Sequence, residues 1–165
     1  MQRHLTLAAC ALLLSFGASA QLKVPKSAAA PAGAAAEPAA SSAAAKSPEV
    51  AEKEQAATLA AQGWLTLLDR KNWGTAWDSS SALFHKAVPL STWMDGIPKV
   101  RADLGALVER TPAETSYKTQ LEGHPPGEYV SIIFLSRFEQ REVQELVTTV
   151  RERDGHWRVT GYSTR

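Results

Sequence analysis

Residues 128–162, EYVSIIFLSRFEQREVQELVTTVRERDGHWRVTGY, decide the fold of this chain. The stretch is rich in β-branched and aromatic residues, and apolar and polar residues alternate along much of it, as is typical of strands. It predicts three consecutive strands, the first of which covers Tyr129–Phe138. Helical patterns precede this stretch, so we expect helices to cover one face of the sheet.

The last two predicted strands are joined at Asp154-Gly155. An Asp-Gly pair between strands favours a two-residue type I′ turn, because both turn positions need a positive φ. That turn pairs Arg153 with His156 and fixes the register of the two strands. One face then carries Leu146, Thr148, Val150, Glu152, Trp157, Val159 and Gly161, and the other carries Val147, Thr149, Arg151, Arg158, Thr160 and Tyr162. The first face is apolar at its centre and is predicted to be the buried one.

The Tyr129–Phe138 strand is apolar on both of its sides. Val130, Ile132, Phe134 and Phe138 lie on one side, and Tyr129, Ile133 and Leu135 lie on the other. A strand of this kind needs a cover on each side. The second cover is expected from a bend of the sheet, from a helix or from another subunit. A homodimer through the second side of the Tyr129–Phe138 strand is therefore one of the expectations.

Upstream of the strands, apolar residues recur at helical spacing. Pro48 suits the first position of a helix that starts there. A second helix is expected over residues 74–85. A third is expected from residue 91 or 92, with a kink or a restart at Pro98 and an end near Gly105.

A further strand is expected over residues 113–121, because Pro112 marks its start. A run of helices followed by a run of strands predicts an α+β fold. In this fold about three N-terminal helices pack on one face of a bent, mainly antiparallel sheet of about four strands. The space between the two layers is expected to be filled by four tryptophans, Trp64, Trp73, Trp77 and Trp93.

The first 20 residues have the parts of a secretory signal peptide. Arg3 precedes an apolar run that is too short to span a membrane, and small residues precede a cleavage site between Ala20 and Gln21. We therefore expect a periplasmic or secreted protein. A lipid anchor at Cys10 is the alternative, and the short apolar run before Cys10 argues against it.

Composition divides the rest of the chain in two. Residues 21–47 are mostly Ala, Pro and Ser and are expected to form a disordered tether before one α+β domain over residues 48–165.

The whole chain has 18 basic and 17 acidic residues, a net charge of +1, which excludes a strongly basic surface for nucleic acid. His85, His124 and His156 are too far apart for metal-ligand spacing, and no Gly-rich phosphate loop is present, so no metal or cofactor is expected.

An ordered set of residues carries a family resemblance. The set is Gly63-Trp64-Leu65, Leu67-Leu68-Asp69, Trp77-Asp78, Leu83-Phe84, Trp93, Arg101, Leu104-Gly105, Arg110, Tyr117, Gly127-Glu128-Tyr129-Val130, Phe138, Trp157-Arg158-Val159 and Gly161-Tyr162. It resembles the exported bacterial family catalogued as domain of unknown function 4019, over nearly all of residues 52–163. The resemblance implies location and architecture but no chemistry. It also implies a likeness to the wider nuclear-transport-factor-2-like (cystatin-like) group, whose helices fold into the concave side of a bent sheet and whose members include enzymes, ligand binders and dimerisation modules.

The concave pocket that this resemblance implies is a candidate site for a small apolar ligand. Trp77, Trp93 and Tyr117 are its expected walls, and Arg101 or Arg137 is its expected polar contact. We therefore expect an exported, non-catalytic binding or interaction module that acts by dimerisation or by binding such a ligand.

A small enzyme of the proton-transfer or hydrolase type is the alternative. Asp78 or Asp103, together with Tyr117, would supply a buried carboxylate in the same pocket. The two interpretations separate on the direction of the carboxylates. An open cavity with one of these aspartates inside favours the enzyme, and a closed interior filled by tryptophan favours the binding module.

Overall fold

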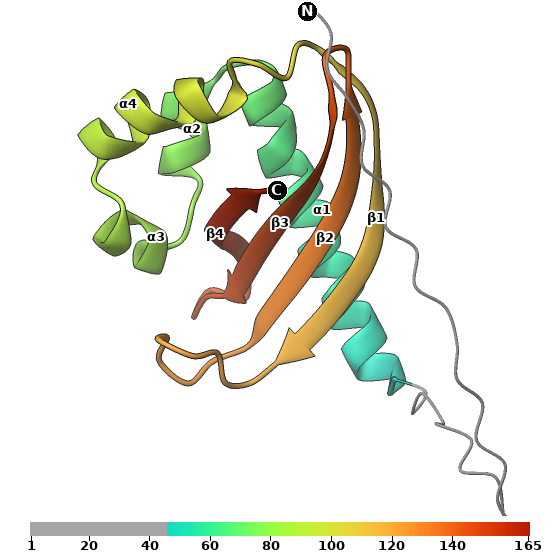
Figure 1. Ribbon diagram of the computed structural model, residues 1–165. Coiled ribbons are helices and arrows are strands. Elements are labelled where there is room, and N and C mark those ends of the chain that lie inside the picture. Colours follow the sequence, from blue (N-terminus) through green and yellow to red (C-terminus); the bar gives the residue numbers. More distant parts are fainter. Residues whose placement is uncertain (1–45) are drawn as a thin grey trace, which may run out of the picture. The chain divides into compact units, whose positions relative to one another are not determined.

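Four helices precede a four-stranded antiparallel sheet over residues 46–165, which are the residues that the computed structural model describes (Figure 1). The helices are α1 (Pro48–Asp69), α2 (Trp73–Asp78), α3 (Ala82–Ala87) and α4 (Leu90–Arg101). The strands are β1 (Leu107–Lys118), β2 (Tyr129–Phe138), β3 (Glu142–Arg151) and β4 (Trp157–Thr164), in the order β1-β2-β3-β4. The predicted α+β class is confirmed. The expected signal peptide, its cleavage site at Ala20 and Gln21, Cys10 and residues 21–45 of the tether lie outside the described residues.

α1 has a defined cap at each end. Ser47 caps its start, just before Pro48, which the sequence predicts as the first helical residue. At its C-terminal end, Asn72 N donates to Leu67 O and Lys71 N donates to Leu68 O, which is the pairing of a Schellman motif. Lys71 has a φ of 59° and is the only residue other than glycine with a positive φ between residues 46 and 165. In Figure 1 α1 runs behind the strands, and it contacts all four of them.

The second predicted helix, residues 74–85, is two short helices in the structure. Ser81 separates α2 from α3, because its N–H donates to Val159 O in β4 at 2.9 Å. Its hydroxyl accepts from Phe84 N–H at 3.1 Å and so caps α3. The sequence around Ser81 does not show that its N–H bonds to a distant strand. The apolar spacing therefore predicted one helix where the structure has two.

α4 and β1 also differ from the predictions at their ends. α4 keeps Pro98 inside it without a restart and ends at Arg101. Gly105, the predicted end of this helix, lies in the turn before β1 with a φ of 78°. β1 begins at Leu107 rather than at residue 113, and Pro112 lies inside the strand at a register shift. An edge strand tolerates proline, because one side of its backbone has no partner in the ladder.

The β3–β4 hairpin has a three-residue loop, residues 153–155, in place of the predicted two-residue turn. Glu152 N donates to His156 O at 2.9 Å, and Gly155 is the only loop residue with a positive φ, 81°. This is the geometry of a type I turn that ends on a glycine in the left-handed region. An Asp-Gly pair fits both kinds of loop, so the sequence did not separate them.

The longer loop shifts the pairing of β3 with β4 by one residue next to the hairpin turn, and a β-bulge at Thr160 restores the predicted pairing further along the strands. Thr148 pairs with Gly161 as predicted, but Thr149 pairs with Val159, so Thr160 is an extra residue in β4. On β4, Trp157 and Val159 pack toward the helices, as predicted. On β3, the side toward the helices carries Val143, Glu145, Val147 and Thr149. The prediction that Leu146, Thr148 and Val150 share the buried face with Trp157 was therefore wrong.

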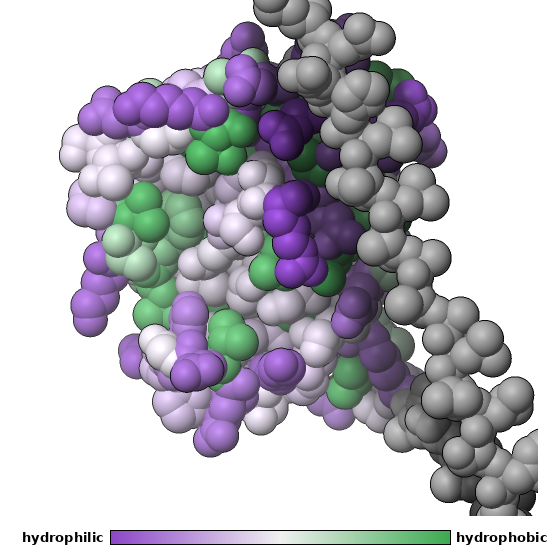
Figure 2. All heavy atoms as spheres, viewed as in Figure 1, coloured by the Kyte–Doolittle hydropathy of each residue, from purple (hydrophilic) through white to green (hydrophobic). Residues whose placement is uncertain are grey.

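The face of the sheet away from the helices, here called the outer face, carries the second apolar side of β2. Ile133 pairs with Leu146 across it, and Leu135 is 48% exposed. Tyr129, at the other end of β2, is buried, and its hydroxyl donates to Pro125 O at 2.7 Å. In the view of Figure 2, apolar residues form separate green patches among pale and purple ones. The outer face is thus closed around Tyr129 and open around Leu135.

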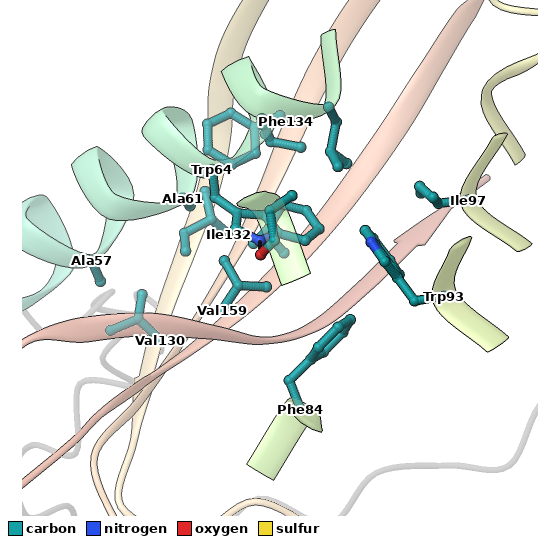
Figure 3. Packing of buried hydrophobic residues seen from close by; sticks show 14 residues of the cluster. Ala57, Ala61, Trp64, Phe84, Trp93, Ile97, Val130, Ile132, Phe134 and Val159 are labelled. Atoms are coloured by element: carbon teal, nitrogen blue, oxygen red, sulfur yellow. Dashed lines mark hydrogen bonds between the residues drawn. The ribbon is translucent and has the colours of Figure 1, made fainter. Parts of the chain in front are cut away.

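The core lies between the helices and the sheet and is filled by aromatic rings (Figure 3). Trp64 of α1 meets Phe84 of α3 and Trp93 of α4, with ring centroids 6.4 and 5.8 Å apart. The indole N–H of Trp64 donates to Ala76 O at 2.8 Å, so burial leaves this donor satisfied. Trp73 and Trp77 pack against the same core from its edge, and its wall on the sheet is formed by Val130, Ile132, Phe134, Val147 and Val159.

Candidate functional site

Four charged side chains meet inside the protein where α1 and α4 end, and we call them the ion cluster: Asp69, Arg101, Arg110 and Glu145. The two helices end on Asp69 and Arg101, whereas Arg110 comes from β1 and Glu145 from β3. The side chains of Arg101, Arg110 and Glu145 are 6%, 7% and 0% exposed. Charges at this depth need partners within the fold, because water cannot solvate them there.

Glu145 is the centre of the ion cluster. Its Oε1 accepts from Arg101 Nη1 and from the Tyr162 hydroxyl, each at 2.8 Å. Its Oε2 accepts from Arg110 Nε at 2.7 Å and from the Ser136 hydroxyl. Donors from α4, β1, β2 and β4 therefore converge on one carboxylate, and both of its oxygens are satisfied.

Asp69 closes the network from α1. Its Oδ2 accepts from Arg110 Nη1 at 2.7 Å, and its Oδ1 accepts from Arg110 Nη2 at 3.0 Å and from Arg101 Nη2. The contact with Arg110 is bidentate, which makes it strong and directional. Both guanidinium groups also lie over the ring of Phe138, 5.2 and 5.8 Å from its centroid. The ion cluster is thus a neutral unit of two arginines and two carboxylates.

The electrostatics of the ion cluster keep Glu145 ionised. Burial acts to raise the pKa of Glu145, but its arginine and hydroxyl partners, first of all Arg110, outweigh burial and hold the pKa below its ordinary value. For Arg110, burial acts to lower the pKa, and the carboxylates of Asp69 and Glu145 outweigh it and raise the pKa. Burial raises the pKa of Tyr162, and the charge of Glu145 raises it further. An ionised carboxylate with satisfied oxygens is a weak base, so this arrangement positions side chains rather than moving protons.

A hollow of about 390 Å³ opens beside the ion cluster, between the ends of α1 and α4 and the start of β1, and we call it the arginine hollow. Its charged lining is Asp69, Lys71 and Arg101, and its apolar walls are Leu68, Trp73, Pro98, Leu107 and Phe138. Apolar walls with a few charged groups are typical of small-molecule sites. The volume lies toward the small end of the range for such sites, about 300–1,000 Å³.

The structure separates the five ligand contacts that the sequence suggested. Arg101 lines the arginine hollow. Trp93 is buried in the core, and its indole N–H donates to Trp73 O at 2.8 Å. Trp77 is half-buried and stacks on His85 with ring centroids 4.0 Å apart. Both tryptophans therefore pack against other residues of the domain, and neither lines the arginine hollow.

Tyr117 and Arg137 lie in two other places. The Tyr117 hydroxyl donates to Glu128 Oε1 at 2.8 Å near the end of β1, where Lys53 also pairs with Glu128. Arg137 is exposed on the outer face and pairs with Glu109 at 3.0 Å. Of the five suggested contacts, Arg101 is the one that lines the arginine hollow.

The carboxylates of the enzyme alternative do not face an interior cavity. Asp78 and Asp103 are both exposed. Asp69 and Glu145 point inward and are each bound by both arginines of the ion cluster. Glu54 is also buried, and its carboxylate accepts from Lys46, from the Thr115 hydroxyl and from Tyr117 N–H. Within residues 46–165 no three His, Cys, Asp or Glu side chains are placed to hold a metal ion. Over the same residues, no helix has both the length and the apolar character to cross a membrane.

The ion cluster was missed by reasoning from the sequence. Its contacts join residues far apart in the chain: Arg110 and Glu145 are 35 positions apart, and Arg101 and Glu145 are 44 apart. One available signal was Glu145 itself, a charge between two inward valines of an alternating strand. Another was that Asp69, Arg101 and Arg110 all belong to the ordered set on which the family resemblance rests.

Comparison with known proteins identifies the family of the chain. A search of curated proteins finds none that matches the chain. The family described as "Protein of unknown function (DUF4019)" matches residues 60–162, which include the whole ion cluster and the walls of the arginine hollow. The likeness to the nuclear-transport-factor-2-like group stays a prediction. Since the matched residues make up more than half of the chain, this protein belongs to the DUF4019 family.

Proposed function

We propose that this protein is an exported, non-catalytic binding module that holds a small apolar ligand in the arginine hollow. The observation that carries the proposal is a hollow with apolar walls beside a fixed polar anchor. Trp73 and Phe138 supply walls, and Arg101 is held in place by the ion cluster. An anchor that is ordered before binding loses little conformational freedom on binding, so more of the interaction energy appears as affinity.

Catalysis by proton transfer is the less favoured interpretation. A general base needs an oxygen that is free to reach the substrate and a pKa near the working pH. Both oxygens of Glu145 are occupied, and its pKa is lowered. Asp69 accepts hydrogen bonds from two arginines, which further supports a positioning role for the ion cluster.

The binding proposal is tested by titrating the mature protein with hexanamide, a short uncharged amphiphile, and following backbone amide signals by NMR. We expect shifts at residues 68–73 and 101–107. Ala102→Trp, at an exposed position of the lining, should fill the hollow and abolish these shifts. Ala87→Trp, exposed at the end of α3 and outside the lining, is the matched control. Shifts that survive Ala102→Trp would reject the arginine hollow as the ligand site, and so would the absence of shifts both with hexanamide and with charged amphiphiles of the same length.

Export is the part of the proposal that rests on the sequence alone. The expected cleavage site follows Ala20. Mass spectrometry of the protein recovered outside the cytoplasm should therefore find Gln21 at the N-terminus. A mature chain that begins at a lipid-modified Cys10 would overturn this assignment.

Self-association is a second candidate function, favoured by the open part of the outer face. Leu135 is exposed there next to a hollow of about 600 Å³ with charges of both signs around it: Glu109, Arg137, Glu142 and Arg165. A face with an apolar centre and a rim of both signs suits a second copy of itself, as a two-fold dimer requires.

The dimer is tested by sedimentation of the mature protein across a range of concentrations. We expect a weak dimer, with a dissociation constant in the micromolar range, because the apolar patches are small. Leu135→Arg should make the protein monomeric, whereas Leu59→Arg, at a side chain on α1 that is 62% exposed, should leave the dimer intact. A wild-type protein that stays monomeric at about 1 mM would exclude this function, since a Kd of that size corresponds to only about 4 kcal/mol.

A further inference from the structure

We propose that the ligand of the arginine hollow is a small monocarboxylate with an aliphatic or aromatic body, and that Arg101 and Lys71 bind its carboxylate. This inference rests on the proposed ligand-binding function and is independent of self-association. It follows from the unused donors, the charge balance and the size of the hollow.

Arg101 has donors to spare. A guanidinium group carries five N–H donors in a planar fork. The structure uses Nη1 on Glu145 and Tyr162 and Nη2 on Asp69, and Nε has no acceptor among residues 46–165. This side chain is 6% exposed and lines the hollow, so its remaining donors can be satisfied only by water or by a ligand there. A carboxylate is the acceptor that a planar guanidinium fork fits best.

Lys71 is a second donor, and it occupies a position that normally belongs to glycine. It follows α1 in the left-handed region, where the Schellman motif favours a residue without a side chain. A side chain kept in such a conformation costs free energy, and residues of this kind cluster at binding sites. Lys71 lines the arginine hollow and takes part in no ion pair between residues 46 and 165. Its ammonium is therefore available to a ligand.

The charge balance of the hollow selects a single negative charge. Among the charged residues of the ion cluster and the lining, Asp69 and Glu145 balance Arg101 and Arg110, so Lys71 leaves one positive charge in excess. Glu139 does not line the hollow, but its carboxylate accepts from the N–H of the lining residue Ala106 and further disfavours a second negative charge on the ligand. The ends of α1 and α4 add partial negative charge from their last carbonyl groups, which further limits how much negative charge the site accepts. A monoanion matches this balance better than a phosphate dianion does.

The walls and the volume define the rest of the ligand. Trp73, Leu107 and Phe138 present apolar surface, so the body of the ligand is aliphatic or aromatic. A hollow of about 390 Å³ is small for a nucleotide and large enough for a short fatty acid or an aryl-alkanoic acid.

The test compares three probes of equal length on the mature protein: hexanoate, hexanamide and hexylamine. Affinities come from the amide shifts around the arginine hollow. Hydrogen bonds from a guanidinium group to an ionised acceptor are stronger than those to a neutral one, so hexanoate should bind at least about tenfold more tightly than hexanamide. Hexylamine should bind most weakly. Lys71→Gln should weaken hexanoate several-fold without changing hexanamide, and Lys99→Gln, exposed and outside the lining, should change neither.

The outcomes separate the ligand class from the binding function. Equal binding of hexanoate and hexanamide in the hollow would overturn the carboxylate inference and leave the binding module standing. Tighter binding of hexylamine than of hexanoate would also overturn the carboxylate inference. It would indicate that the partial negative charge at the ends of α1 and α4 dominates the electrostatic potential of the hollow. Failure of all three probes to shift signals around the hollow would reject both proposals. Loss of hexanoate preference in Lys99→Gln as well as in Lys71→Gln would show a diffuse surface effect and reject the assigned contact.

Discussion

Two groups of charged side chains lie toward opposite ends of β1 and use the same chemistry in different surroundings. The ion cluster is near the start of the strand. The second group, which we call the open cluster, is near its end and consists of Lys53, Tyr117, Glu128 and Arg151. Each group has a carboxylate that accepts from two cationic side chains and from a tyrosine hydroxyl at 2.8 Å. The side chain of Glu145 is 0% exposed, whereas that of Glu128 is 29% exposed.

The comparison shows that a hydrogen-bond pattern does not set the energetic role of a carboxylate. Where water reaches a charge, it replaces a lost partner, so an exposed ion pair contributes little to stability. Where water does not reach it, removal of one partner leaves the others buried and uncompensated. The ion cluster is therefore a fixed part of the structure that positions Arg101, and the open cluster is a surface feature.

The largest effect is expected for Glu145→Gln. This change keeps the size of the side chain but leaves two buried guanidinium groups with one carboxylate. We expect a loss of about 3–5 kcal/mol in the free energy of unfolding, measured by urea denaturation. The matched change Glu128→Gln, in the open cluster, should cost about 1 kcal/mol or less. Similar losses in the two variants would remove the distinction between the clusters.

A double variant sharpens this expectation. Arg110→Met together with Glu145→Gln removes one charge of each sign and leaves Arg101 paired with Asp69. The double variant should recover most of the stability that Glu145→Gln alone loses, because the uncompensated charge is gone. Strictly additive losses would mean that the cost comes from packing rather than from charge.

An intermediate effect is expected from pH. The pKa of Glu145 is lowered from an ordinary value of 4.5, so near that pH the unfolded chain binds a proton that the folded protein does not. The stabilisation of the folded protein by ionised Glu145 is complete above the ordinary pKa of 4.5 and is lost as the pH falls through the lower pKa of the folded state. The difference in unfolding free energy between wild type and Glu145→Gln should therefore shrink as the pH falls from neutral to below 4.5. A difference that stays constant over this range would contradict an ionised Glu145.

Tyr162 gives the opposite arm of the pH profile. Its pKa is raised from 10.0, so the folded protein keeps a proton that the unfolded chain loses above that value. Stability should fall as the pH rises past 10, and Tyr162→Phe should remove that part of the fall.

Salt distinguishes the clusters at neutral pH. About 1 M salt should screen the open cluster and leave the effect of Glu145→Gln nearly unchanged.

The same contrast explains what could be predicted from the sequence. The start of α1 at Pro48, the run of helices before the strands and the inward side of Trp157 follow from local pattern, and the structure has them. The face of β3 was predicted wrongly, because Glu145 breaks the apolar alternation and the three-residue loop pairs Val159 with Thr149 rather than with Val150. Prediction from sequence patterns fails where a residue breaks the periodicity of its strand or helix, and such residues concentrate at functional sites. Arg101 was identified as a contact, but its partners come from elements that only the tertiary fold brings together.

The smallest effect is expected at Lys71, in the lining of the arginine hollow. Lys71 has a φ of 59°, so Lys71→Gly should raise the free energy of unfolding by about 1 kcal/mol. The preceding Arg70, with a φ of −83°, is the matched control, because Arg70→Gly relieves no strain and should lower stability by about 0.5–1 kcal/mol. Lys71→Gly should at the same time weaken hexanoate binding. A more stable protein that binds less well would mark Lys71 as a residue kept for its charge, whereas a gain in stability with unchanged binding would leave its conformation without a functional cause.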